Sequence, residues 1–358
     1  MGSTVKRLLL PAGADPSVLP LLVGRALRAL VDGYMAVLLP AYLLAIGLGT
    51  LEVGIIATAT MLGSALCTVA VGAWGHRSSS GRLLRGAALL MAATGIGFAA
   101  FSSFWPLLLV AFVGTLNPSS GDVSVFLPLE HARLAAAARG PARTSLFARY
   151  SLLGALAAAL GALAAAAPDL LASHGLSRLA GLRAMFVLYA GVGVGVWWLY
   201  RQPAKENDDA KVPPTAPLGP SRGIVVRLAG LFSVDAFAGG LVVNSLLSLW
   251  LFERFHVSLA QAGTFFFFAG LLSAVSQLAA PLLARRIGLL NTMVFTHIPA
   301  NVCLLLAAFA PSLPLALGLL LVRSALSQMD VPTRTAYVMA VVTPAERPAA
   351  ASFTAVPR

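Results

Sequence analysis

The sequence predicts an all-α protein that crosses a membrane many times and is built from two related halves. Three observations support this prediction: an apolar composition, a series of apolar segments of membrane-spanning length, and a repeated set of glycine, arginine and aspartate positions. Hydrophobic residues make up 58% of the 358 residues, charged residues make up only 11%, and the mean hydropathy is +0.86. A soluble domain could not bury so much apolar surface, whereas a lipid bilayer accepts it.

Ten apolar segments are long enough to cross a bilayer, which takes about 20 helical residues. A charged, proline-rich stretch at 201–223 separates the first six segments from the rest. We therefore expect an N-terminal six-helix half at 1–200, a cytoplasmic linker at 201–223 and an incomplete C-terminal half at 224–358. The predicted spans are 20–47, 50–74, 83–102, 104–129, 144–167, 182–200, 224–252, 258–284, 289–310 and 313–342.

The basic residues predict the orientation of the chain. If the N-terminus lies in the cytoplasm, nearly all loop lysines and arginines fall on the cytoplasmic side, as the positive-inside rule requires. The same rule accounts for the net charge of +12 without a nucleic-acid partner. We expect a multi-pass protein of the cell inner (plasma) membrane. The predicted cytoplasmic loops hold Arg77, Arg82, Arg85, Arg133, Arg139, Arg143, Arg201, Lys205, Lys211, Arg222, Arg285, Arg286 and Arg347, and the opposite side holds Arg178, Arg183 and Arg254.

A set of positions recurs with nearly the same spacing in the two halves. A glycine is followed 23 residues later by an arginine, and an Asp-Val pair begins 44 or 45 residues after that arginine. The first span of each half also carries a single acid. Agreement at all these positions predicts two parallel repeats with the same topology. The recurring residues are Gly54, Arg77 and Asp122 in the first half and Gly263, Arg286 and Asp330 in the second, with Asp32 and Asp235 as the acids of the first spans.

The loop after the second span resembles a motif of the major facilitator superfamily. In that superfamily this loop reads Gly-x-x-x-Asp-Arg followed by Gly-Arg, and here it reads GAWGHR at 72–77 followed by Gly81-Arg82. His76 replaces the aspartate of the family, and two extra residues precede Gly81. The second copy, PLLARRIG at 281–288, also lacks the aspartate. The resemblance extends over essentially the whole sequence.

This resemblance implies a fold of two six-helix halves related by an axis along the membrane normal. The sequence supplies ten or eleven of the twelve helices, so we expect the protein to continue for roughly 50 residues, enough for two more spans. The segment RSALSQMDVPTR at 323–334 is similar to one found in a prokaryotic branch of unassigned substrates. The glycine-rich motif of drug antiporters is absent from the fifth span.

Ionisable residues inside the predicted spans are the candidate functional residues, because a charge at the bilayer centre costs at least ~2.5 kcal/mol. The deep acids are Asp32, Asp122, Asp235 and Asp330, one each in the first, fourth, seventh and tenth spans. The resemblance implies that these four spans line a central cavity. Acids therefore occur only where water or a solute could reach them.

We expect two groups among the candidate residues. The first would bind the solute or carry protons, because a buried carboxylate can take up a proton on one side and release it on the other. Arg28 lies four residues before Asp32 and therefore on the same helical face. The second group would form ion pairs that hold helices together or close a gate. The first group is Asp32, Asp235, Arg28, Asn244, Arg323 and Gln328, and the second is Asp122, Glu130, Arg149, Asp330, Arg334, Arg77 and Arg286.

The expected function is secondary active transport of a small solute, coupled to protons and achieved by alternating access of the two halves. The expected partners are the solute, protons and the lipid bilayer, with the protein acting as a monomer and without a cofactor. His256 and His297 have no sequence spacing typical of a metal site. Two alternatives stay open: a membrane-embedded lipid-modifying enzyme, which the scattered acids disfavour, and a receptor or scaffold with a transporter fold, which the charged cavity spans disfavour.

Overall fold

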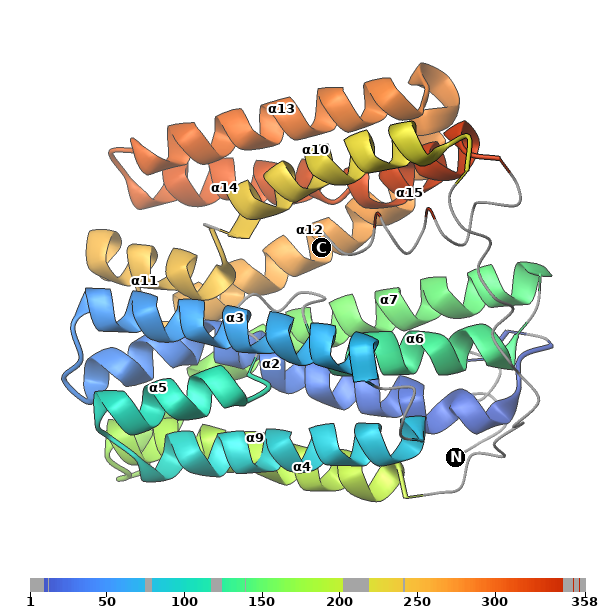
Figure 1. Ribbon diagram of the computed structural model, residues 1–358. Coiled ribbons are helices and arrows are strands. Elements are labelled where there is room, and N and C mark those ends of the chain that lie inside the picture. Colours follow the sequence, from blue (N-terminus) through green and yellow to red (C-terminus); the bar gives the residue numbers. More distant parts are fainter. Residues whose placement is uncertain are drawn as a thin grey trace. The chain divides into compact units, whose positions relative to one another are not determined.

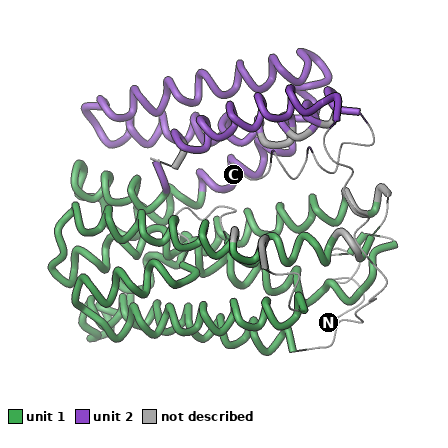
Figure 2. Tube along the Cα trace, viewed as in Figure 1, with its two compact units in different colours: residues 1–207, 244–267 green, residues 208–243, 268–358 purple. Residues whose placement is uncertain are grey.

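In the computed structural model, every regular element among the described residues is helical (Figure 1). The structure describes residues 10–11, 13–74, 79–116, 124–138, 140–201, 219–240, 242–343, 350 and 354. The chain divides into two compact units (Figure 2). Unit 1 contains residues 1–207 and 244–267, and unit 2 contains residues 208–243 and 268–358.

Unit 1 includes the elements from η1 to α9, which all lie within residues 1–207. Three-residue 3₁₀ turns, η1 and η3, precede α2 and α8. α11 and the first part of α12 also belong to this unit. The elements are η1 (Pro16–Val18), α2 (Leu19–Ala45), α3 (Thr50–Trp74), α4 (Ser80–Ala100), α5 (Phe104–Val113), α6 (Phe126–Ala137), α7 (Gly140–Leu163), η3 (Ala164–Ala166), α8 (Ala167–Ser173), α9 (Arg178–Leu199), α11 (Asn244–Phe255) and the start of α12 (Leu259–Ile287).

In its described residues, unit 2 contains the remaining part of α12 and four further helices. α13 packs against both α14 and α15, and α15 also contacts α10. A small apolar core joins α10 and α15 around Val225, Phe232 and Val338. The helices that complete this unit are α10 (Arg222–Gly240), α13 (Leu289–Ala308), α14 (Leu313–Ser327) and α15 (Asp330–Val341).

Seven of the described helical segments are long and apolar enough to cross a membrane. Each overlaps one of the predicted spans, so the prediction of a multi-pass membrane protein is confirmed. Large apolar side chains such as Leu89, Ile96 and Val187 are exposed, as expected for surfaces that face lipid. The seven segments are Pro16–Ala45, Thr50–Thr68, Ser80–Ala100, Ser145–Ser173, Arg178–Leu199, Leu259–Ile287 and Leu289–Ala308.

Three predicted spans are wrong as single helices. The span predicted at 104–129 contains α5 and the start of α6, that at 224–252 contains α10 and α11, and that at 313–342 contains α14 and α15. α10 ends in two glycines, which are poor helix formers. Pro332 lies in the first turn of α15, where its missing N–H disturbs no helical hydrogen bond. In a continuous helix the same proline would remove a bond and distort the chain.

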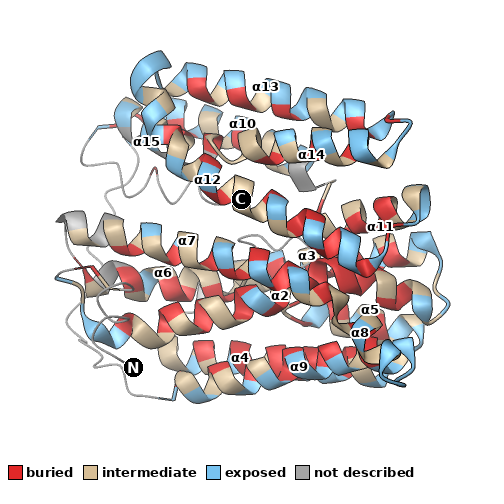
Figure 3. Ribbon diagram, turned by 180° about the vertical axis from the view of Figure 1, so that it is seen from behind, coloured by how far each residue is buried: buried red, intermediate tan, exposed pale blue. Residues whose placement is uncertain are grey.

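α2 is the most buried helix of unit 1, and buried residues run along most of its length (Figure 3). α2 packs against α7, α9 and α11. A Cβ atom built at Gly33 would lie 2.0 Å from the carbonyl oxygen of Ala158, and one at Gly161 would lie 1.8 Å from that of Leu30. The backbones of α2 and α7 therefore touch, as small residues allow in membrane proteins.

α4 and α9 show the same close contact, and it leads to a prediction. A Cβ at Gly193 of α9 would lie 2.7 Å from the backbone nitrogen of Ala92, whereas a Cβ at Gly191 would meet nothing within 4 Å. We expect Gly193→Ala to destabilise the purified protein by about 1–3 kcal/mol through overpacking, seen as a lower thermal unfolding midpoint. Gly191→Ala is the control, and equal midpoints for the two variants would contradict this packing.

Candidate functional site

Unit 1 contains a buried polar cluster formed by Arg28, Glu130, Tyr150 and Tyr200, named here the Arg28 cluster. The Nη2 atom of Arg28 lies 2.7 Å from Oε2 of Glu130, and Nη1 donates to the Tyr200 hydroxyl at 2.7 Å. The hydroxyl groups of Tyr150 and Tyr200 both donate to Glu130. The side chains of Arg28 and Glu130 are 5% and 0% exposed. Both carboxylate oxygens of Glu130 therefore accept hydrogen bonds away from bulk water.

Aromatic rings and glycines complete the surroundings of the Arg28 cluster. The guanidinium carbon of Arg28 lies 3.9 Å from the centroid of the Phe126 ring, a cation–π contact. A Cβ at Gly24 would lie 2.4 Å from the Tyr200 hydroxyl, and one at Gly154 would lie 2.4 Å from Nε of Arg25. The glycines thus leave room for large polar side chains between α2, α7 and the end of α9.

The Arg28 cluster connects four parts of unit 1. Arg28 belongs to α2, Glu130 to α6 and Tyr150 to α7, and Tyr200 follows α9. A buried ion pair is tolerated only when its geometry is good and further hydrogen bonds satisfy the remaining groups. This cluster meets both conditions. The spacing of four residues places Arg28 on the same face of α2 as Asp32, and the structure adds an ion pair of Arg28 with Glu130 from another helix.

Asp32 lies one turn beyond Arg28 on α2, with a partly buried side chain. Two further tyrosines of unit 1 bond to backbone carbonyls. The Tyr34 hydroxyl donates to Met185 at 3.1 Å, and the Tyr189 hydroxyl donates to Thr115 at 3.4 Å. Arg149 is partly buried on α7. Asp122 and Arg77, two residues of the predicted gating group, lie outside the described residues.

Unit 2 contains a second polar cluster, formed by Asp235, His297, Asp330 and Arg334 and named here the Asp235 cluster. Oδ1 of Asp235 lies 2.9 Å from Nε2 of His297, and Oδ2 lies 2.6 Å from Nη2 of Arg334. Arg334 also forms an ion pair with Asp330, one turn earlier on α15. The side chains of Asp235 and His297 are each 34% exposed, against 12% for Arg334 and 8% for Asp330. The cluster joins α10, α13 and α15.

His297 is the functional candidate that the sequence analysis missed. Its spacing to other metal-ligand residues along the sequence predicts no metal site, and no sequence pattern gives it another role. The available signal was its place in the predicted span 289–310, because an ionisable side chain inside a span is a functional candidate by default. Its partner Asp235 is 62 residues away in the sequence, so no local pattern could join them.

The remaining predicted residues occupy more separate positions. Asn244 begins α11, and its carbonyl accepts from the Ser248 hydroxyl at 2.9 Å. Arg323 lies on α14 with a buried Nε atom that has no hydrogen-bond partner among the described residues. Gln328 caps the C-terminus of α14, and Arg286 is exposed in the last turn of α12. The structure therefore brings together Arg28 with Glu130, and Asp235 with Asp330 and Arg334.

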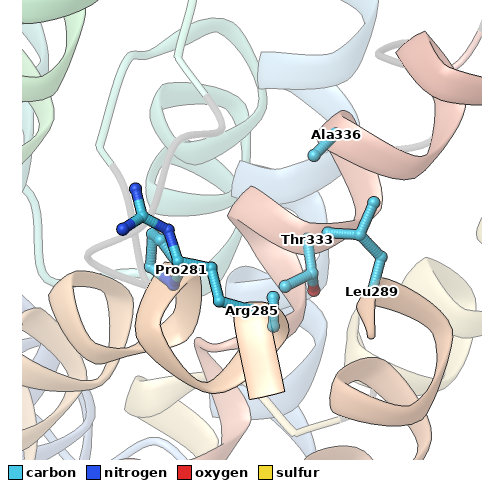
Figure 4. A pocket seen from close by; sticks show the side chains of 6 residues that line it. Pro281, Arg285, Leu289, Thr333 and Ala336 are labelled. Carbon is cyan, nitrogen blue, oxygen red and sulfur yellow. The ribbon is translucent and has the colours of Figure 1, made fainter. Parts of the chain in front are cut away.

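A cavity of about 220 Å³ lies in unit 2, where α12 ends and α13 begins (Figure 4). Its wall is mostly apolar. The Thr333 hydroxyl already donates to backbone carbonyls of its own helix. None of the predicted functional residues lines this cavity. The lining residues are Pro281, Ala284, Arg285, Leu289, Thr333 and Ala336.

Comparisons with known proteins agree with this architecture. The sequence profile of the Major Facilitator Superfamily matches residues 21–356. The membrane protein YJR124C of Saccharomyces cerevisiae is 26% identical to this chain over 89% of the chain and 79% of its own length. The predicted all-α membrane fold is therefore confirmed.

Solved structures of transporters share the fold at low sequence identity. The nucleoside transporter NupG is 14% identical with a TM-score of 0.71, covering 96% of this chain and 87% of its own. A bacterial homologue of the human lysosomal transporter Spinster is 17% identical with a TM-score of 0.67, covering 96% and 79%. A D-xylose–proton symporter is 16% identical with a TM-score of 0.66, covering 95% and 87%.

The Arg28 cluster leads to a prediction about stability. Glu130→Gln removes the carboxylate that lies 2.7 Å from Nη2 of Arg28 and leaves this buried guanidinium less well compensated. We expect a loss of about 3–5 kcal/mol in the free energy of unfolding, measured by denaturant or thermal unfolding of the purified protein. Glu253→Gln, which changes an exposed glutamate of α11, is the control. Equal stability of the two variants would show that the pair contributes little.

Proposed function

This chain belongs to the major facilitator superfamily, and on that premise we propose that it is a proton-coupled secondary active transporter. It moves a small solute across a bilayer by alternating access of two helical halves. The observation that carries the proposal is the presence of ionisable side chains in the first helix of each predicted half, Arg28 and Asp32 on α2 and Asp235 on α10. Charges are retained inside membrane helices where a solute or ion pathway needs them.

In this proposal Asp32 and Asp235 carry protons, and Arg28, Asn244, Arg323 and Gln328 line the solute pathway. The gating ion pairs come from the second group: Asp122, Glu130, Arg149, Asp330, Arg334, Arg77 and Arg286. One contact lies within the second group, because Arg334 pairs with Asp330. Two further ion pairs join the two groups, Glu130 with Arg28 and Arg334 with Asp235. The sequence has no phosphate-binding loop, which favours an ion gradient over ATP as the energy source.

The setting of the transporter is also part of the proposal. The excess of arginine and lysine in the expected cytoplasmic loops supports an N-terminus in the cytoplasm and insertion in the plasma (inner) membrane. We propose a monomer, as two halves within one chain can alternate without a second copy. Membership of a family of transporters disfavours the alternative of a lipid-modifying enzyme.

A thermal-shift screen would identify the solute class. The purified full-length protein is heated with D-xylose, uridine, inorganic phosphate or tetraphenylphosphonium, which represent sugars, nucleosides, anions and lipophilic cations. A solute present at about 100 times its dissociation constant adds about 2.7 kcal/mol of stability, so we expect a clear rise in the unfolding midpoint for one class. No rise with any class, for a protein shown to be folded, would favour the receptor or scaffold alternative.

Transport by an Asp32 variant would test the proton-carrier role. We expect Asp32→Asn in proteoliposomes to lower uptake of the identified solute driven by a proton gradient at least tenfold, because an amide cannot exchange a proton at this position. Exchange of labelled for unlabelled solute without a gradient should persist. Asp169→Asn, at a surface ion pair with Arg178, is the control. Gradient-driven uptake that survives in Asp32→Asn would exclude Asp32 as the carrier.

A further inference from the structure

We infer that Asp235 and His297 together form a proton-binding site in unit 2, and that its occupancy decides whether Arg334 ties α15 to α10. The inference deepens the proposed function and rests on it for the use of the proton in transport. The site itself rests on the contacts of the Asp235 cluster. The sequence predicts proton carriers at Asp32 and Asp235 and gives His297 no role in this.

The two oxygens of Asp235 have different partners. Oδ1 faces Nε2 of His297 at 2.9 Å, and Oδ2 faces Nη2 of Arg334 at 2.6 Å. The other ring nitrogen of His297, Nδ1, is buried and has no hydrogen-bond partner among the described residues. The neutral ring therefore carries its proton on Nε2, where Asp235 accepts it. Histidine is the side chain whose ordinary titration lies nearest physiological pH, so this pair is suited to gain and lose a proton.

The charge balance of the cluster favours uptake of one proton. Arg334 is permanently cationic, and Asp235 and Asp330 supply two carboxylates. With a neutral His297 the four side chains carry one net negative charge, and with one added proton they carry none. A net charge is costly in surroundings of low dielectric constant. The added proton removes this charge whether the ring or the carboxylate of Asp235 holds it.

Accessibility separates the proton-binding pair from the rest of the cluster. Asp235 and His297 are each one-third exposed, whereas Arg334 and Asp330 are nearly buried. No other ionisable group on the elements packed around the cluster bonds to His297 within the described part of the chain. These other groups are Arg222 and Arg227 on α10, Arg323 on α14 and Tyr337 on α15.

Proton uptake changes which helices Arg334 connects. The Arg334–Asp330 pair lies within α15, so it persists in either state. The Arg334–Asp235 pair joins α15 to α10, and an added proton reduces the negative charge that Asp235 offers to Arg334. The pair between α15 and α10 is therefore weaker when the site is protonated and stronger when it is empty. Asp330 is the first residue of α15, directly after the interruption at Gln328 and Met329. The Arg334–Asp235 ion pair therefore connects the beginning of α15 to α10.

Histidine NMR of the full-length protein in lipid nanodiscs would test the site without a solute. The chain has five histidines, and the His297 signal is identified by its loss in His297→Gln. We expect this signal to move with pH between 5 and 9. In Asp235→Asn we expect proton binding at His297 about tenfold weaker, since the carboxylate that stabilises the imidazolium is gone. Asp169→Asn is the control and should leave the His297 titration unchanged.

Two results would overturn the inference. One is a His297 signal that stays constant over this pH range, and the other is the same titration in wild-type protein and Asp235→Asn. If Asp235→Asn does not fold, two other variants replace it. Asp235→Glu keeps a carboxylate and should keep the His297 titration. Arg334→Gln removes the cation that shares Asp235 with His297 and should change the pH at which His297 titrates. Because no transport is measured, a negative result leaves the proposed function standing. Absence of proton-driven transport in a protein whose His297 titrates would count against the proposed function alone.

Discussion

A charge inside a bilayer needs a partner, and in unit 1 the pairing of Arg28 with Glu130 meets this need. Because the pair is almost completely withdrawn from water, its remaining hydrogen-bonding capacity must also be satisfied. Tyr150 and Tyr200 supply the two hydroxyl donors and so bring α7 and the end of α9 to the same point. Residues from four segments of unit 1 therefore meet at one ion pair. The close glycine contacts of α2 with α7 provide the short separation that this geometry requires.

In the Asp235 cluster of unit 2 the charged side chains also have partners, but they remain partly exposed and do not balance in charge. Glu130 has a donor on each oxygen and no exposed surface, which favours a fixed contact. Asp235 also has a partner on each oxygen, but it is one-third exposed, and one partner is a histidine that can change its charge. Two acids share a single arginine here, which leaves a negative charge to be balanced. The fully paired Arg28 cluster is closed to water in this conformation, whereas a partly exposed cluster with surplus charge suits the exchange of an ion.

Hydropathy and spacing predicted the membrane spans, because lipid selects for long apolar segments and these are visible in the sequence. They did not predict the interruptions, since apolar residues lie on both sides of Gly240, and the polar residues Ser327, Gln328 and Asp330 around Met329 fall within a stretch that is apolar on average. Charge pairing was predicted only where it is local. Arg334 lies four residues after Asp330, and the structure joins them. The ion pair between Arg28 and Glu130 joins two helices that are far apart in the sequence, and no local spacing predicts it. Contacts between distant helices, such as that of His297 with Asp235, leave no trace in sequence spacing.

The interrupted spans are those at 104–129, 224–252 and 313–342, and each contains one of the deep acids. An interruption leaves backbone N–H and C=O groups without helical partners, and such groups are tolerated at membrane depth only inside protein or beside water. The same two settings are the ones that tolerate an ionisable side chain. Asp330 begins the helix that follows one interruption, and Asp235 lies five residues before the end of the helix that precedes another. The coincidence of broken helices with acids is therefore what a polar pathway requires, because each feature alone would be costly against lipid.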